Sequence, residues 1–168
     1  MSPVKTSTQR ELVELLPRLR RFARALTRHP ADADDLVQLA LERALMNMNQ
    51  PKPDSRMDSW MFRIIRNAWI DETRARGRWN TVLAPEEAGQ NVGDASAADG
   101  VNLLSMQQAM ATLPEEQRSA VALVLIEGLS YKQAAATLEV PVGTLTSRLA
   151  RGREALQALL GSDAGGKQ

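Results

Sequence analysis

Apolar residues recur at steps of three and four positions along most of this chain, and sustained alternation of apolar and polar residues is absent. The helical spacing covers Gln9–Thr27, then 32–48, and then a long stretch from near Asp58 toward Arg76. Pro17 interrupts the first stretch, so we expect the helix to kink or to restart there. The predicted core residues of this half are Leu12, Leu15, Leu16, Leu19, Phe22, Ala23, Leu26, Leu36, Ala40, Ala44, Met48, Met61, Ile64, Ile65 and Ala68.

Acids and prolines mark where these helices begin and end. Asp32 is the predicted N-cap of the second helix, because its carboxylate can accept a hydrogen bond from a free backbone N–H. Asp34 and Asp35 suit the positive end of the helix dipole. The segment 49–56 contains two prolines and is predicted to be a loop.

Helical spacing is lost between Asn80 and Gly100, where Gly, Ala and acidic residues leave little to bury. Such a composition predicts a flexible linker. Helix is expected again at Val101–Leu113. The predicted organisation is all-α, with helical domains at 8–79 and 102–160, a flexible acidic linker at 80–101 and a disordered tail at 161–168.

The C-terminal domain contains the pattern of a helix-turn-helix. Pro114 is expected in the first turn of a helix that stops at Gly128. Ser130 and Gln133 have the spacing of a capping box, and 139–143 then turn the chain. The residues predicted to face the core of this unit are Ala134, Ala135, Leu138, Leu145, Leu149, Gly152, Leu156 and Leu159 or Leu160.

The last helix also carries a polar face, away from its apolar stripe. Thr144, Ser147, Arg148 and Arg151 lie on it, and no acid interrupts the run from Gly143 to Arg153. Hydroxyls and guanidinium groups at a helix start can contact phosphates and base edges in a major groove. This unit is therefore predicted to bind duplex DNA, although an ordinary helical hairpin with a solvated arginine face has the same pattern.

Composition narrows the function classes. The chain of 168 residues has no cysteine and one histidine, so disulfides and thiolate metal sites are excluded, and no catalytic site, metal or cofactor is expected. The N-terminus lacks the apolar stretch of a signal peptide, and no apolar run is long enough to span a membrane, so we expect a cytoplasmic protein without membrane insertion. Residues 1–80 carry fifteen basic and ten acidic residues, which suits a polyanionic partner.

Three motifs in this order resemble the extracytoplasmic-function (ECF) sigma factors, the small two-domain initiation subunits of bacterial RNA polymerase. The family's core-polymerase-binding helix resembles "DADDLVQLALERAL", and its promoter-melting and −10 helix resembles "SWMFRIIRNAWIDETRARGR". Its −35-binding domain resembles 113–156, from "LPEEQRSAV" to "LARGREAL". The resemblance covers nearly all of 10–160 and implies an all-α protein without an enzymatic activity.

The resemblance also implies roles for individual residues. Those expected to bind the clamp helices of the largest polymerase subunit are Asp32, Asp34, Asp35, Leu36, Gln38 and Arg43. Those expected at the −10 DNA are Asn49, Lys52, Arg56, Arg63, Arg66, Asn67, Asp71, Arg74, Arg76 and Arg78. Those expected at the −35 DNA are Lys132, Val142, Gly143, Thr144, Thr146, Ser147, Arg148, Arg151 and Arg153.

Other family features carry over to single positions. The loop 47–58 matches the specificity loop, which receives a base flipped out of the non-template strand. Trp60 is expected in the core, because family members bury an aromatic residue there. Glu139 departs from the family, since many helix-turn-helix units have Gly at this turn, and a positive φ would cost Glu conformational energy.

The resemblance implies an alternative sigma factor that binds the −35 element as duplex and the −10 element as melted single strand. Its implied partners are core RNA polymerase (the clamp helices and the flap of the second-largest subunit), promoter DNA and an anti-sigma factor. A stand-alone helix-turn-helix regulator is the main alternative, and it would bind an operator without polymerase. A helical adaptor of other proteins is a third, and it would not need Arg148 or Arg151.

Overall fold

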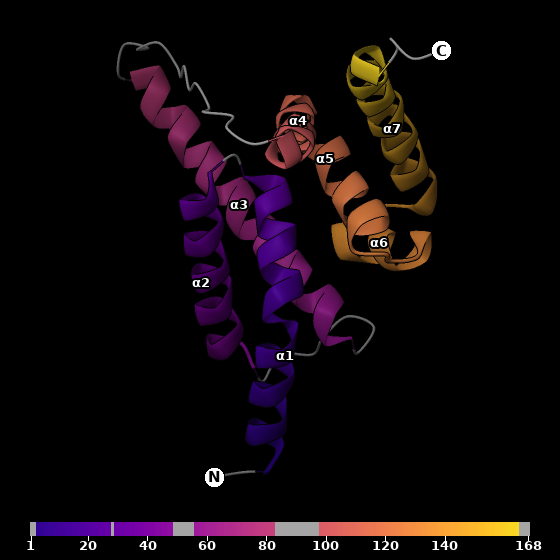
Figure 1. Cartoon of the computed structure of the whole chain (residues 1–168). Helices are drawn as coiled ribbons and strands as arrows, with labels where there is room; N and C mark the ends of the chain where they lie inside the picture. The colour runs from indigo at the N-terminus through magenta and orange to yellow at the C-terminus, as the bar shows by residue number, and fades with distance from the viewer. Residues whose placement is uncertain (1–2, 28, 49–55, 83–97, 165–168) are drawn as a thin grey trace.

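The computed structural model describes residues 3–27, 29–48, 56–82 and 98–164, and within these residues all regular structure is helical (Figure 1). Side chains are described for 7–27, 29–48, 56–77 and 105–161. The elements are α1 Pro3–Leu26, α2 Pro30–Met46, α3 Met57–Val82, α4 Ala98–Thr112, α5 Glu115–Val121, the π-helical turn η2 Ala122–Ile126, α6 Tyr131–Leu138 and α7 Val142–Ala164. The all-α prediction is confirmed. None of the described helices has the length and apolar character needed to cross a bilayer.

Helices α1, α2 and α3 pack against one another and form an N-terminal body (Figure 1). Their apolar stripes meet in its core, where the rings of Phe22 and Phe62 lie 4.9 Å apart between centroids. Trp60 is buried, as the family resemblance implies, and so is Trp69. Of the predicted core residues, Leu15, Leu16, Met48 and Ile64 are only partly buried at its edge.

Helices α4 to α7, with η2, form a C-terminal body. The continuous segment α5–η2 packs against α7, and α6 packs beside it to complete a helix-turn-helix. Leu123 and Leu145 are inaccessible to solvent at the centre of this unit. The predicted stripe of α7 is confirmed at Leu145, Leu149, Gly152 and Leu156, whereas Leu159 is exposed and Leu160 is partly buried.

The local signals of the helix-turn-helix act as the sequence predicts. Ser130 and Gln133 form the capping box, with side-chain to backbone distances of 3.1 and 3.0 Å. Gly128 stops the preceding helix at a φ of 76°, and the N–H of Leu129 reaches back to the carbonyl of Leu123. Glu139 adopts a φ of 58° in the left-handed region, so the turn places a non-glycine residue where Gly is preferred.

Several predicted boundaries are wrong. Helix α2 begins at Pro30 with His29 as its N-cap, so Asp32 lies in the first turn and is not the cap. The fixed φ of proline favours the first helical position, which moves the start earlier. Of the two outcomes predicted at Pro17, a kink or a restart, the restart is wrong, because α1 is one helix that runs through Pro17. Pro114 precedes α5 as its N-cap instead of lying in its first turn.

Helix also extends into the predicted linker from both sides, to Val82 in α3 and from Ala98 in α4. Residues 83–97 of that linker lie outside the described part of the chain. The same holds for 49–55 of the predicted loop and for 165–168 of the predicted tail, while α7 continues to Ala164.

The two bodies are in direct contact. Helix α1 packs against η2, α4 and α5, and α3 packs against α6. Arg118 of α5 donates to the carbonyls of Met110 and Leu113 at the end of α4, and also to that of Leu26 at the end of α1, 3.0 Å away. One guanidinium therefore satisfies free carbonyls at the C-terminal ends of helices from both bodies.

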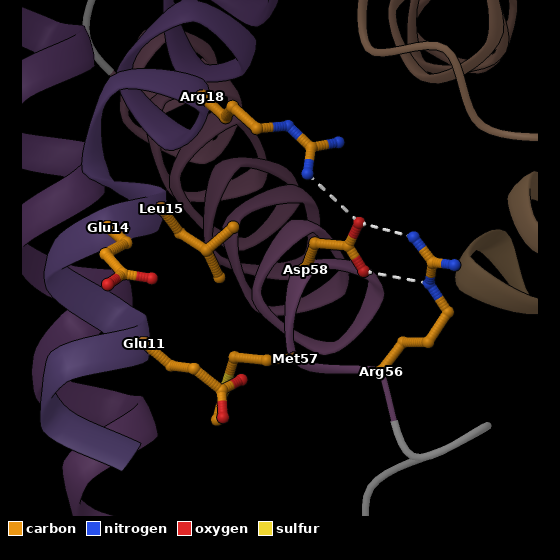
Figure 2. A pocket seen from close by; sticks show the side chains of 7 residues that line it. All are labelled: Glu11, Glu14, Leu15, Arg18, Arg56, Met57 and Asp58. Atoms are coloured by element: carbon orange, nitrogen blue, oxygen red, sulfur yellow. Dashed lines mark hydrogen bonds and ion pairs between the residues drawn. The ribbon is translucent and has the colours of Figure 1, made fainter. Parts of the chain in front are cut away.

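A charged network fixes the start of α3, next to residues 49–55 (Figure 2). The carboxylate of Asp58 accepts from Arg56 at 3.1 and 2.8 Å and from Arg18 of α1 at 3.1 Å. These groups line an open pocket of about 340 Å³ together with Glu11, Glu14, Leu15 and Met57. Burial raises the pKa of Asp58, but hydrogen bonds from Arg56, from the Ser59 N–H and from Arg18 outweigh it, so the pKa lies below its ordinary value.

We expect Asp58→Asn to lower the free energy of unfolding at neutral pH by about 1–3 kcal/mol, because hydrogen bonds to a nearly buried charge are lost. The contribution of Asp58 is present above the ordinary carboxyl pKa of about 3.9 and is lost as the pH falls through its lowered folded pKa. The gap between wild type and variant should therefore narrow below about pH 4. Urea unfolding at a series of pH values measures this, and a gap that widens on acidification would contradict it.

At Gly152, helix α7 packs closely against α5. A Cβ added there would lie 2.7 Å from Cγ2 of Val121 and 3.4 Å from Gln117. We expect Gly152→Ala to destabilise the chain by about 1–3 kcal/mol through overpacking. Gly77→Ala is the matched control, because nothing lies within 4 Å of its added Cβ and alanine favours helix. In thermal unfolding, Gly152→Ala should lower the Tm and Gly77→Ala should raise it, each relative to wild type. A Gly152→Ala protein as stable as wild type would refute the packing argument.

Candidate DNA and polymerase interfaces

The start of α7 presents a polar, basic face to solvent. The capping box at Ser130 and the left-handed Glu139 fix the angle between α6 and α7, and the fully buried Leu145 anchors the far side of α7. The exposed positions of the predicted −35 set are Lys132, Val142, Gly143, Ser147, Arg151 and Arg153. The half-buried ones are Thr144, Thr146 and Arg148.

Most cations of this face are available to a ligand. Among the described residues no ion pair involves Lys132, Arg151 or Arg153. Arg148 lies 3.7 Å from the carboxylate of Glu116, which is 62% exposed, and so makes only a loose pair. Lys132 and Arg151 thus carry positive charge that is unpaired among the described residues, and the helical spacing puts Thr144, Ser147, Arg148 and Arg151 on one side of α7. Arg153 lies on another side of that helix, where it lines the pocket that contains Leu156 and Leu160.

The predicted −10 residues on α3 divide into two groups. Asp71, Arg74 and Arg76 are exposed toward the C-terminal end of the helix, with Asn67 half buried one turn earlier. Arg76 pairs with Asp32 of α2 at 3.4 Å and lies over the ring of Trp69. Asn49, Lys52 and the side chain of Arg78 lie outside the described residues, and Arg56 is engaged with Asp58.

The second group faces the C-terminal body. Arg63 is paired with Glu139 in the helix-turn-helix turn, and Arg66 lies 3.4 Å from the carboxylate of Glu115 at the start of α5. Arg66 is only 16% exposed. In this arrangement these two arginines contact the protein itself and are not free to contact a nucleic acid.

The predicted polymerase-binding residues lie along the first turns of α2. Asp34, Asp35 and Gln38 are exposed, while Asp32 pairs with Arg76. Arg43, further along α2, pairs with Asp71 of α3 at 3.3 Å. The acidic end of α2 and the basic end of α3 therefore form one continuous charged surface. Leu36 was predicted both for the core and, from the family resemblance, for this contact. It is 1% exposed, so the core prediction is confirmed and the contact is corrected, because a buried side chain cannot reach a partner.

A groove at the junction of the bodies was not predicted. Its apolar lining includes Ala25 of α1, Met106 and Met110 of α4, and Ile126 of η2, within a volume of about 600 Å³. The basic residues that line it are Arg20, Arg21 and Arg24. A second pocket of about 430 Å³ shares Met106 and continues along Leu125, Leu156 and Leu160. The run of arginines in α1 was the available signal, but only the packing of α1 on α4 and η2 makes a groove of it.

Glu127 is a second feature that the sequence did not reveal. It caps η2, its side chain is entirely buried, and it accepts hydrogen bonds from Arg21 of α1 at 2.8 and 2.9 Å. Arg18 adds a contact at 3.3 Å. The hydrogen bond and the attraction of Glu127 raise the pKa of Arg21 above its ordinary value, although burial works against this.

Family models match both bodies. The model for the Sigma2 domain of PhyR matches residues 12–66, and that for Sigma-70, region 4 matches residues 103–156. The second range contains α5, η2, α6 and α7 as far as Leu156, and the first contains the acidic start of α2 and the first part of α3.

Individual relatives match over most of their length. The ECF RNA polymerase sigma factor EcfG of Rhodopseudomonas palustris is 35% identical over 158 residues, which cover 94% of this chain and 87% of the relative. The sigma factor RpoE from Bartonella quintana, solved in complex with the anti-sigma factor NepR, has a TM-score of 0.76 at 33% identity, covering 94% of this chain and 98% of that one. CnrH, solved with the cytosolic domain of CnrY, has a TM-score of 0.68 at 27% identity, covering 92% and 90%. With both bodies matched in order and nearly the whole length aligned, this chain belongs to the ECF RNA polymerase sigma factors.

Proposed function

We propose that this chain directs RNA polymerase to its promoters by binding the −35 element as duplex and the −10 element as melted single strand. The observation that carries the proposal is the exposed, unpaired polar and basic face at the start of α7, on a helix whose opposite side is fixed in the core. Such a helix fits the major groove of B-DNA, where its first turns can contact base edges. The role requires the chain to bind and to position, without a covalent step of its own.

The −10 function is assigned to α3. Arg74 and Arg76 are exposed there, and a basic track suits the phosphates of an unpaired strand. Melting costs a few kcal/mol for each unstacked base, so contacts made only with the opened strand are needed to offset it. The predicted specificity loop, which lies mostly outside the described residues, precedes α3 directly and is proposed to hold the flipped base.

The acidic start of α2 is proposed as the contact with the polymerase clamp. Asp34 and Asp35 are exposed at the positive end of the helix, with Gln38 one turn further. Carboxylates held on a rigid helix steer association with a basic partner surface. Because this surface adjoins Arg76 through Asp32, binding of polymerase and of the −10 strand would take place side by side. A cytoplasmic location follows from this partner.

We further propose an anti-sigma partner that occupies the groove between the bodies. RpoE of Bartonella quintana was solved in complex with the anti-sigma factor NepR, and CnrH was solved with the cytosolic domain of CnrY. In this chain the groove combines an apolar lining at Met106 and Met110 with three arginines, which suits an amphipathic helix whose polar side is acidic. Because α1 and α4 both line it, a helix bound there would contact both bodies at once.

Arg151→Ala and Arg148→Ala should each weaken promoter-specific initiation by about 1–3 kcal/mol where a base contact is lost, which is roughly ten- to hundredfold. Arg10→Ala, an exposed change on α1, is the matched control for loss of positive charge. Run-off transcription with core polymerase on a promoter selected from a genomic pool measures the effect. Failure of the folded wild-type chain to support any polymerase-dependent initiation would refute the proposal, and tight operator binding without polymerase would favour the stand-alone regulator.

Met106→Glu should abolish or strongly weaken binding of an acidic amphipathic helix, because it places a like charge on the apolar lining of the groove. NepR of the Bartonella quintana complex is the probe, titrated calorimetrically into wild type and variant. We expect at least a tenfold loss, about 1.4 kcal/mol. Equal binding by both proteins would place the partner elsewhere, and no binding to wild type would rule out a NepR-like partner.

A further inference from the structure

We propose that Glu127 is an internal latch, which holds the free chain in a closed state where two of its proposed DNA-binding arginines are occupied. The closed state is defined by the contacts of Glu127 with Arg18 and Arg21, and opening them is proposed to precede promoter binding. The latch itself is inferred from the contacts between the bodies; only its consequence for DNA binding rests on the proposed function.

The first argument is the burial of Glu127. Its side chain has no exposure to solvent, yet both arginines that contact it belong to α1 of the other body. Carboxylates are rarely buried unless they are paired and hydrogen-bonded. Glu127 is paired and hydrogen-bonded only while the N-terminal body is docked against it. Its burial is therefore compatible with the arrangement of the two bodies in which α1 supplies Arg18 and Arg21.

The second argument concerns the strength of such a contact. The desolvation of a buried ion pair offsets much of its attraction, so the pair contributes more to the choice of arrangement than to the total stability. Arg21 also remains 54% exposed, which allows water to replace Glu127 when the bodies separate. The Glu127–Arg21 pair can therefore select the closed arrangement and still be broken when a partner binds the open one.

The third argument is what the closed state covers. With the bodies docked, Arg63 is paired with Glu139 and Arg66 lies against Glu115, so acids of the C-terminal body occupy two arginines of α3. The same acids sit at the helix-turn-helix turn and at the start of α5. A strand of nucleic acid approaching this part of α3 would have to displace the C-terminal body.

Arg18 extends the latch toward the proposed specificity loop. Its guanidinium contacts Glu127 and Asp58 and lies over the ring of Phe62, 5.2 Å from its centroid. Asp58 in turn holds Arg56, the residue that follows 49–55. Arg18 therefore takes part both in the contact with Glu127 that defines the closed state and in the network at Asp58 that fixes the start of α3.

A ligand that binds only the open state shifts this equilibrium by its preference for that state. Its apparent affinity is reduced in proportion to the fraction of molecules that are closed. Weakening the latch should therefore lower the fraction of closed molecules. Two measurements would show this: a larger mean separation of the two bodies and a lower apparent Kd for core polymerase.

The experiment uses the absence of native cysteines, so that two introduced ones can be labelled selectively. Gln9→Cys on α1 and Glu154→Cys on α7 are exposed positions, one in each body, and a donor and acceptor dye are attached to them in the full chain. Glu127→Gln and Arg21→Gln are introduced separately and together. Glu72→Gln is the control, because it removes an ion pair within α3 and leaves the junction untouched.

We expect Glu127→Gln and Arg21→Gln each to lower the energy transfer, the double variant to add little to the single ones, and Glu72→Gln to leave it unchanged. The apparent Kd for core polymerase should fall by about threefold or more in the latch variants. Circular dichroism verifies that each variant is folded; Arg21→Gln alters a half-exposed side chain and remains informative if Glu127→Gln does not fold.

Energy transfer that is unchanged in both Glu127→Gln and Arg21→Gln would overturn the latch. Additive losses in the double variant would also overturn it, because they would show that the two residues act independently. A drop in energy transfer without any polymerase-dependent transcription by wild type would instead refute the proposed function and leave the latch standing.

Discussion

The pairing of the Glu127 carboxylate with two arginines is the contact on which the proposed closed arrangement of the two bodies depends. It comes from the end of η2, it is entirely buried, and it is satisfied by arginines that α1 supplies from the other body. An unpaired charge in that position would be strongly unfavourable, so the contact either forms with its arginines or the bodies separate and water takes their place. In the proposed latch, this requirement for a partner is what selects one closed arrangement of the two bodies.

The interior of each body is built differently from the contact between them. Within the bodies, aliphatic stripes, the Phe22–Phe62 pair and the close approach at Gly152 bury apolar surface with few polar groups. Between the bodies, guanidinium groups carry much of the specificity: Arg18 and Arg21 at Glu127, and Arg118 at the end of α1. Apolar packing suits a permanent core, whereas hydrogen-bonded charges suit a surface that alternates between a protein partner and water.

The proposed DNA-binding surfaces on α7 and α3 differ in whether their arginines are already paired with carboxylates of the protein. On α7, Arg151 makes no ion pair among the described residues and Arg148 makes only a loose one, so this face is available for the proposed contact with duplex DNA. On α3, Arg63 and Arg66 contact the C-terminal body, and Arg76 is shared with Asp32. Under the proposed function, Arg63 and Arg66 would reach a nucleic acid only after it displaced these carboxylates, and recognition of the melted strand would then be linked to a change in the arrangement of the bodies.

The sequence by itself determined the helical elements, the capping box at Ser130, the stop at Gly128 and the buried sides of α3 and α7, because spacing and capping are local properties of the chain. Its motifs also identified the family, whose models match both bodies. It misplaced the start of α2 at Asp32 because two local signals, Pro30 and the acid, competed there. The groove at Met106 and the pairing of Glu127 were decided only by tertiary structure, since each depends on residues from helices far apart in the chain, and periodicity along one helix cannot specify which surface will cover it.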